Sequence, residues 1–269
     1  MWHTLGVYRR LLGAQIRSQM QYRVAFLMDL LAAALIVAVE FGSIALVLQR
    51  FEEIRGWTVA EVAFLYGLVE IAFGTMDMVF SGFDPANFGR EVRRGTFDRL
   101  LLRPVNLTVQ VLGAEFALRR LGRIAFGLAI FGLALAQVEV LWTPAKLLYL
   151  PLVVLGMVCF FGGLFVIGAT ITFWTIESIE VMNILTYGGS FTISYPMSIY
   201  RDWLRHFFTF VLPAIFLNYY PALYFLDKPD PLGFPAWAPF VSPLVGLGML
   251  GLALAFWRYG VGKYQSTGT

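Results

Sequence analysis

Residues 147–174 read LLYLPLVVLGMVCFFGGLFVIGATITFW, without one charged side chain. A helix crosses the hydrocarbon core of a membrane with about 20 apolar residues, so this stretch is long enough to span it. Apolar segments of comparable length recur at residues 24–48, 62–80, 124–141, 181–200 and 236–257. We therefore predict an all-α integral membrane protein, with six transmembrane helices in a single domain at residues 1–269.

The composition supports this class. Hydrophobic residues make up 59% of the chain and charged residues 14%, against about 45–50% and about 25% in ordinary globular proteins. Folding in water buries only about three quarters of a chain's surface, so the apolar excess must face lipid. The net charge of +3 is too small to indicate a nucleic-acid partner.

The segment 204–226 is apolar but interrupted by Pro213, Asn218 and Pro221. Proline removes a backbone donor and disrupts the preceding helical turn. We expect an external re-entrant hairpin of two short helices, because irregular backbone at membrane depth must pack against protein or line a cavity. A seventh full span is the alternative.

The distribution of basic residues predicts the orientation. With six spans and a cytoplasmic N-terminus, 14 of the 20 basic residues lie on the cytoplasmic side, as the positive-inside rule requires. Both termini are then cytoplasmic. In residues 1–22, Leu5, Tyr8, Leu12 and Ile16 recur at helical spacing among arginines, which predicts an interfacial helix on the membrane surface. A mobile tail is the alternative.

Several chemistries are not supported by the residues. A single cysteine, Cys159, leaves no disulfide framework or thiolate metal site, and two histidines are too few for an intramembrane zinc protease. Gly246, Gly248 and Gly251 spell a dinucleotide fingerprint, but they lie in an apolar segment, where small residues let helices approach closely. We expect no cofactor and no nucleotide site in this chain, and no enzymatic activity of its own.

Two acidic residues, Glu70 and Asp77, lie seven residues apart in the second apolar segment, and so on one helical face. A charge at membrane depth costs about 2.5–3.5 kcal/mol on insertion scales. They either line a pathway for a cationic or polar substrate or pair with arginines for structural reasons.

The loop at residues 82–104 contains FGREVRRGTFDRLLLRP at 88–104. Phe88 and Val92 fall on one face of a short helix that Gly95 would end in a left-handed conformation. Thr96 is expected to cap a second short helix, which Pro104 stops. We predict a docking element formed by Phe88, Arg90, Glu91, Arg94, Gly95, Asp98, Leu101, Leu102, Arg103 and Pro104. The alternative is a lipid-surface loop whose arginines only enforce topology.

This loop resembles the signature of permease subunits of type-2 ABC transporters, in the branch that includes viologen-exporter-like drug permeases. The matching residues are Gly95, Phe97, Asp98, Leu101, Leu102, Arg103 and Pro104. Two further matches are Leu212 and Pro213 followed by NYYPA at 218–222, and the ending YQSTG at 264–268.

The resemblance implies a six-span permease in a bacterial inner membrane, whose coupling helix docks on a separate ATPase. ATP and Mg would bind that ATPase, present in two copies, and a second permease, often a different sibling, would complete the complex. The implied function is export of drugs or other amphipathic or cationic small molecules. An ion-coupled secondary transporter would usually show repeated halves, and an intramembrane enzyme would need a nucleophile, a base or a metal set. We find neither in the sequence.

Overall fold

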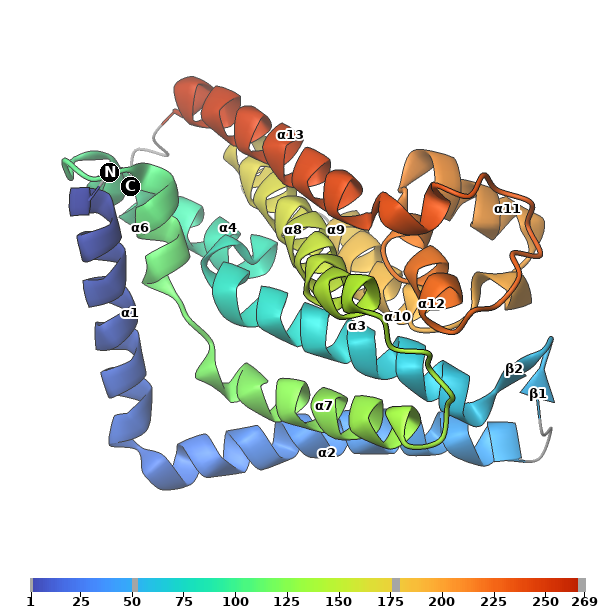
Figure 1. Cartoon of the computed structure of the whole chain (residues 1–269). Helices are drawn as coiled ribbons and strands as arrows, with labels where there is room; N and C mark the ends of the chain where they lie inside the picture. Colours follow the sequence, from blue (N-terminus) through green and yellow to red (C-terminus); the bar gives the residue numbers. More distant parts are fainter. Residues whose placement is uncertain (1, 50–52, 176–179, 266–269) are drawn as a thin grey trace.

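The computed structural model describes residues 2–49, 53–175 and 180–265, and it is almost entirely helical (Figure 1). The long helices are α1 (Trp2–Gln21), α2 (Arg23–Gln49), α3 (Val59–Phe80), α7 (Leu121–Leu135), α8 (Pro144–Thr175) and α13 (Ser242–Lys263). A two-residue antiparallel pair, β1 (Glu53–Ile54) and β2 (Trp57–Thr58), leads into α3. The terminal residues 266–268 of the sequence resemblance lie outside the described residues.

Shorter elements connect these helices. Between α3 and α7 they are η1 (Ser81–Phe83), α4 (Pro85–Arg93), α5 (Thr96–Leu101), α6 (Leu107–Ala114) and η2 (Leu118–Arg120). Between α8 and α13 they are α9 (Glu180–Asn183), η3 (Ile184–Gly188), α10 (Gly189–Ile193), η4 (Met197–Ile199), α11 (Asp202–His206), η5 (Phe207–Val211), η6 (Ala214–Phe216), α12 (Tyr219–Phe225) and η7 (Ala238–Phe240).

The described residues contain 4 helices long and apolar enough to cross a membrane, or up to 5 if one bent pair forms a span. They fall at Arg23–Ser43, Val59–Arg93, Pro144–Thr175 and Ser242–Lys263. In the predicted span 124–141 the helix ends at Leu135, and in the predicted span 181–200 it ends at Ile193. Both are shorter than a full crossing, so the count of six spans stays a prediction.

Helix α3 is the central helix of the bundle. It packs against α7 on one side and α8 on the other, and α13 runs along α8 (Figure 1). The hydroxyl of Thr58 and the carboxylate of Glu61 form a capping box, which fixes the start of α3 at Val59. In contrast, α2 contacts mainly α7 and exposes a long row of apolar side chains.

Two helix crossings depend on glycine. A Cβ atom on Gly246 of α13 would lie 2.0 Å from the carbonyl oxygen of Gly156 on α8, and one on Gly67 of α3 would lie 2.8 Å from the Phe131 nitrogen on α7. Gly248 and Gly251 have nothing within 4 Å of such an atom. The expected role in close helix approach therefore applies to Gly246 among the three fingerprint glycines.

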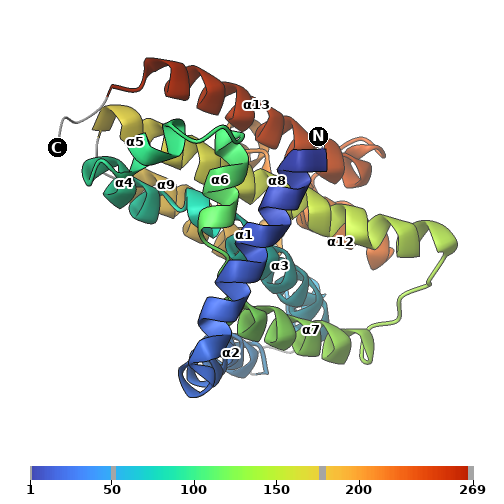
Figure 2. The same ribbon diagram turned by 90° about the vertical axis from the view of Figure 1, so that its left-hand side faces the viewer.

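Helix α1 runs across the ends of the long helices rather than along them (Figures 1 and 2). Its Gln15 side chain donates to the Ala114 carbonyl at 2.5 Å, and Gln19 donates to the Phe116 carbonyl at 2.6 Å. These bonds hold α1 against α6 and the segment that follows it. Ile16 and Met20 remain exposed on α1, as expected for a helix with one lipid-facing side.

At the opposite end, α11–η5 and η6–α12 form two helical arms bent by 84° around Pro213. Asn218 is fully buried between them and the bundle, and its amide donates to the carbonyls of Leu65 at 3.2 Å and Ile193 at 2.8 Å. Irregular backbone at this position therefore packs against protein. A broken span and a re-entrant hairpin both fit this geometry.

Candidate functional site

The segment from α4 to α5 forms a compact pair of helices joined by Gly95. Asp84 accepts a hydrogen bond from the Asn87 backbone nitrogen at 2.9 Å and caps α4, with Pro85 in its first turn. Gly95 takes the left-handed conformation, with φ 66° and ψ 8°. This turn lets α5 begin immediately, so the two helices meet at a fixed angle.

The expectation that Thr96 caps α5 is wrong. Gly95 occupies the cap position, and Thr96 is already the first helical residue. Its hydroxyl therefore reaches back to α4, where it donates to the Glu91 carbonyl oxygen at 2.9 Å and to the Glu91 carboxylate. The hydroxyl ties the two short helices together instead of capping one of them.

An aromatic cluster anchors this helix pair to the long helices. Phe88 and Phe97 are buried against Phe173 of α8 and Trp257 of α13, with ring centroids 5.1–6.3 Å apart. Tyr264 packs edge-on against Phe97 with centroids 4.9 Å apart. Such aromatic pairs add about 0.5–1.5 kcal/mol each beyond area burial. The predicted docking residue Phe88 therefore faces the bundle and not an outside partner.

Asp98 is also turned inward. Its Oδ1 accepts a hydrogen bond from the Tyr264 hydroxyl at 2.8 Å. Burial, and then this bond to a carboxylate, raise the pKa of Tyr264 to about 12, so the phenol stays a donor above pH 10. The bond connects α5 to the segment that follows α13.

The outer side of the pair exposes apolar and basic groups. Leu101 is 44% exposed and Leu102 is 84% exposed, while Leu100 is half-buried. Arg103 and Pro104, which follow them in the chain, are also exposed, as is Arg94 at the end of α4. An exposed leucine pair beside cations, on a scaffold fixed from behind, is chemically suited to contact a protein partner.

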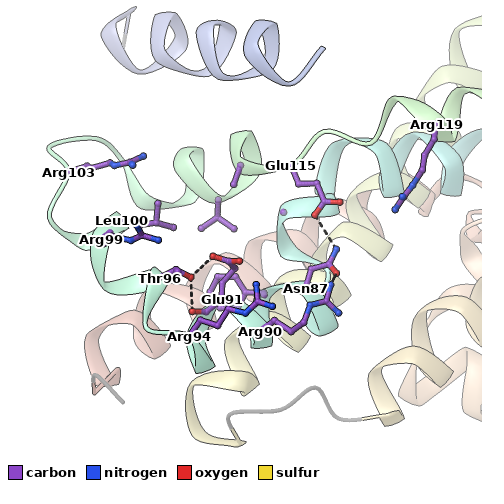
Figure 3. A pocket seen from close by; sticks show the side chains of 14 residues that line it. Asn87, Arg90, Glu91, Arg94, Thr96, Arg99, Leu100, Arg103, Glu115 and Arg119 are labelled. Atoms are coloured by element: carbon purple, nitrogen blue, oxygen red, sulfur yellow. Dashed lines mark hydrogen bonds between the residues drawn. The ribbon is translucent and has the colours of Figure 1, made fainter. Parts of the chain in front are cut away.

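A cavity of about 660 Å³ opens between α4–α5 and α6 (Figure 3). We call it the arginine cavity; its lining residues are Gly82, Asn87, Phe88, Arg90, Glu91, Arg94, Thr96, Arg99, Leu100, Arg103, Val111, Ala114, Glu115 and Arg119. The Glu115 carboxylate accepts from the Asn87 amide at 3.1 Å. Burial raises the pKa of Glu115, and Arg119 opposes that shift.

Glu70 and Asp77 both lie against arginines. The Nε and Nη2 atoms of Arg123 lie 2.5 Å and 2.8 Å from the two Glu70 carboxylate oxygens. Arg120 Nε lies 2.8 Å from Asp77 Oδ2. The two acidic residues are 2% and 3% exposed. This arrangement matches the second possibility raised from the sequence, in which the two acidic residues pair with arginines for structural reasons. A role of Glu70 and Asp77 in a substrate pathway stays a prediction.

A sequence model of the ABC-2 family transporter proteins matches residues 34–268, nearly the whole chain. The chain belongs to this family. No curated protein and no solved structure gives a significant match. The ABC-2 assignment makes the chain a multi-pass membrane permease subunit of an ABC transporter.

Several residues of this ABC-2 permease escaped the sequence reasoning. In the sequence, Arg120 and Arg123 contributed only to the count of cytoplasmic basic residues. In the structure, Arg120 pairs with Asp77 and Arg123 pairs with Glu70, although the partners are far apart in the chain. The anchoring role of Trp257 carried no local signal. Tyr264 stood in a recognisable ending, but its bond to α5 links residues 166 positions apart.

Proposed function

We propose that this ABC-2 permease exports amphipathic or cationic small molecules, energised by a separate ATPase that docks on α4–Gly95–α5. The observation that carries the proposal is the combination of an exposed leucine pair, Leu101 and Leu102, with a buried aromatic anchor on the same short element. A partner can contact the exposed leucine side of α4–Gly95–α5, while the aromatic side of the same element already packs against α8 and α13.

ATP and Mg would bind the partner, and closure of the ATPase dimer would move the docked element. Phe88 and Phe97 would pass that motion to Phe173 and Trp257. Because a ligand bound elsewhere can shift a conformational equilibrium only by binding two states differently, the ATPase must contact Leu101 and Leu102 differently in each.

The proposed assembly contains two ATPase copies and two permeases, the second a different sibling of this chain. The proposed location is a bacterial inner membrane, with six spans, both termini cytoplasmic and α1 on the inner surface. The viologen-exporter-like branch rests on the loop and the ending of the sequence. An ion-coupled transporter that used Glu70 and Asp77 would need these carboxylates free, whereas each faces an arginine.

Co-purification tests the docking. Leu102→Asp should leave the permease in the membrane but remove the ATPase from the purified complex, and Leu101→Asp should act in the same direction. Burying a fully exposed leucine is worth about 1.5–3 kcal/mol, so losing Leu102 alone weakens binding about ten- to hundredfold.

Leu141→Asp is the matched control, because Leu141 is 73% exposed and lies in the loop before α8, at the other end of the bundle. It should keep the ATPase. Full ATPase recovery and full export with both Leu101→Asp and Leu102→Asp would refute the docking role.

A further inference from the structure

The arginine cavity carries a charge that the permease itself does not balance. Its lining holds five guanidinium groups, from Arg90, Arg94, Arg99, Arg103 and Arg119, against two carboxylates. Arg90, Arg94, Arg99 and Arg103 come from the α4–α5 segment and the loop after it, and Arg119 comes from η2 and lies farther along the cavity (Figure 3). Like charges gathered along one cavity repel one another, and an anion bound among them would lower that repulsion.

Both carboxylates of the cavity are already engaged. Glu91 accepts from the Thr96 hydroxyl and Glu115 accepts from the Asn87 amide. Among the described residues, none of the cavity's arginines forms an ion pair. Arg90 donates to the Asn87 side-chain oxygen, but no carboxylate in the described part of the chain neutralises any of the five guanidinium groups. They can therefore pair with an outside anion, and their planar donor geometry suits phosphate oxygens in particular.

A second cavity next to the arginine cavity is suited to an apolar part of the same ligand. This elbow cavity, of about 350 Å³, lies where α1 turns into α2 and shares Glu115 and Arg119 with the arginine cavity. Its lining includes Tyr22, which joins α1 to α2, and Ala25 and Phe26 in the first turn of α2, a helix long and apolar enough to cross a membrane. A ligand whose phosphate lies near Arg119 would have its apolar part beside α2, in the lipid.

We infer that the arginine cavity binds the phosphate headgroup of an anionic phospholipid, whose acyl chains pass the elbow cavity along the start of α2. The cavity volume lies within the range of about 300–1,000 Å³ typical of ligand pockets. Basic pockets beside membrane helices are a known kind of headgroup site. An acidic segment of a protein partner would satisfy the arginines but would leave the apolar side of the elbow cavity unused.

The test uses the full-length permease in neutral detergent, with bound ligand counted by native mass spectrometry. Phosphatidylglycerol should bind saturably and at least tenfold more tightly than phosphatidylcholine. Arg99→Gln with Arg119→Gln should weaken phosphatidylglycerol binding tenfold or more. Neither arginine belongs to the proposed ATPase-docking residues, so this result and the docking result are distinguishable. Arg258→Gln, at an exposed arginine of α13, is the matched control and should leave binding unchanged.

Four outcomes would overturn the inference. They are undiminished phosphatidylglycerol binding in the double variant, an equal loss in the Arg258 control, equal binding of phosphatidylcholine, and complete displacement of the lipid by inorganic phosphate or by the ATPase. If the double variant cannot be purified, the wild-type chain decides. Raising the salt concentration should weaken phosphatidylglycerol binding at least severalfold because the contact is ionic, and salt-insensitive binding would refute it.

Discussion

The ion pair between Glu70 and Arg123 offers the sharpest test of how this bundle is held together. The two side chains are 3% and 18% exposed, and two hydrogen bonds of 2.5 Å and 2.8 Å join them between α3 and α7. The Arg123 guanidinium also lies 4.8 Å from the Phe73 ring centroid. Removing one partner strands the other charge inside a tightly packed crossing, next to Gly127.

The expected cost of Arg123→Met is about 3–5 kcal/mol of unfolding free energy, the usual penalty for breaking a buried pair. The cost of an unpaired charge at membrane depth, about 2.5–3.5 kcal/mol, gives a consistent figure. Glu70→Gln should cost somewhat less, because the longer arginine can reach toward solvent. The double variant should lie close to the wild type or within about 1–2 kcal/mol of it, because no charge is left unpaired.

Reversible unfolding in mixed micelles, followed by circular dichroism, measures these differences as a double-mutant cycle. The control is Arg205→Met, whose loss should be smaller because the carboxylate left behind, on Asp202, is 76% exposed. Single variants that each cost under about 1 kcal/mol, or costs that simply add in the double variant, would refute the structural role. If Glu70→Gln instead alters export of cationic compounds more than neutral ones at unchanged stability, the pathway hypothesis gains support.

Three further predictions concern other parts of the chain. Gly246→Val should destabilise the bundle by about 1–3 kcal/mol through overpacking against the facing carbonyl on α8, whereas Gly248→Ala should be tolerated; thermal unfolding measures both. Because the pKa of Tyr264 is raised from 10.0 to about 12, its bond to α5 is present below pH 10 and lost as pH rises through 12. Absorbance at high pH, compared with Tyr264→Phe, should show this late ionisation. Val211→Cys, at a 70% exposed position, should react in intact cells with an impermeant thiol reagent in a Cys159→Ala background, and labelling from the cytoplasmic side alone would contradict the proposed topology.

Hydropathy predicts the helices whose apolar length exceeds a membrane crossing. Helices α2, α3 and α8 enclose the expected segments, whereas α13 begins at Ser242 and ends at Lys263 and so lies further along the chain than the expected 236–257. Hydropathy overestimates the helical length of the other two expected spans, 124–141 and 181–200, because it sums apolar composition and does not locate helix ends. Helix α7 ends at Leu135, before the polar residues Gln137 and Glu139. The helical run ending at Ile193 stops before Pro196, which disfavours helical backbone at the residue before it.

The local geometry of the docking element was more predictable than its contacts. Gly95 signals a left-handed link, and Phe88 with Val92 signals a buried face, because both features depend on neighbouring residues. The contacts of Phe88 with Trp257, and of Asp98 with Tyr264, depend on which distant helices pack together. No periodicity within the loop encodes that choice, so the sequence assigned Phe88 and Asp98 to the docking element without showing that both attach it to the rest of the chain.

The aromatic contacts that attach α4 and α5 to α8 and α13 affect how motion of the docking element would reach the long helices. Helix α4 follows α3 through η1, yet its Phe88 ring packs against α8 and α13, so the element bridges two groups of helices. The glycine contact between Gly156 and Gly246 holds α8 and α13 together, and the Glu70 pair holds α3 to α7. A push at Leu102 should therefore displace α8 and α13 as one body against α3 and α7. The weakest joint between these two bodies, and not the docking contact itself, would then determine where the permease opens.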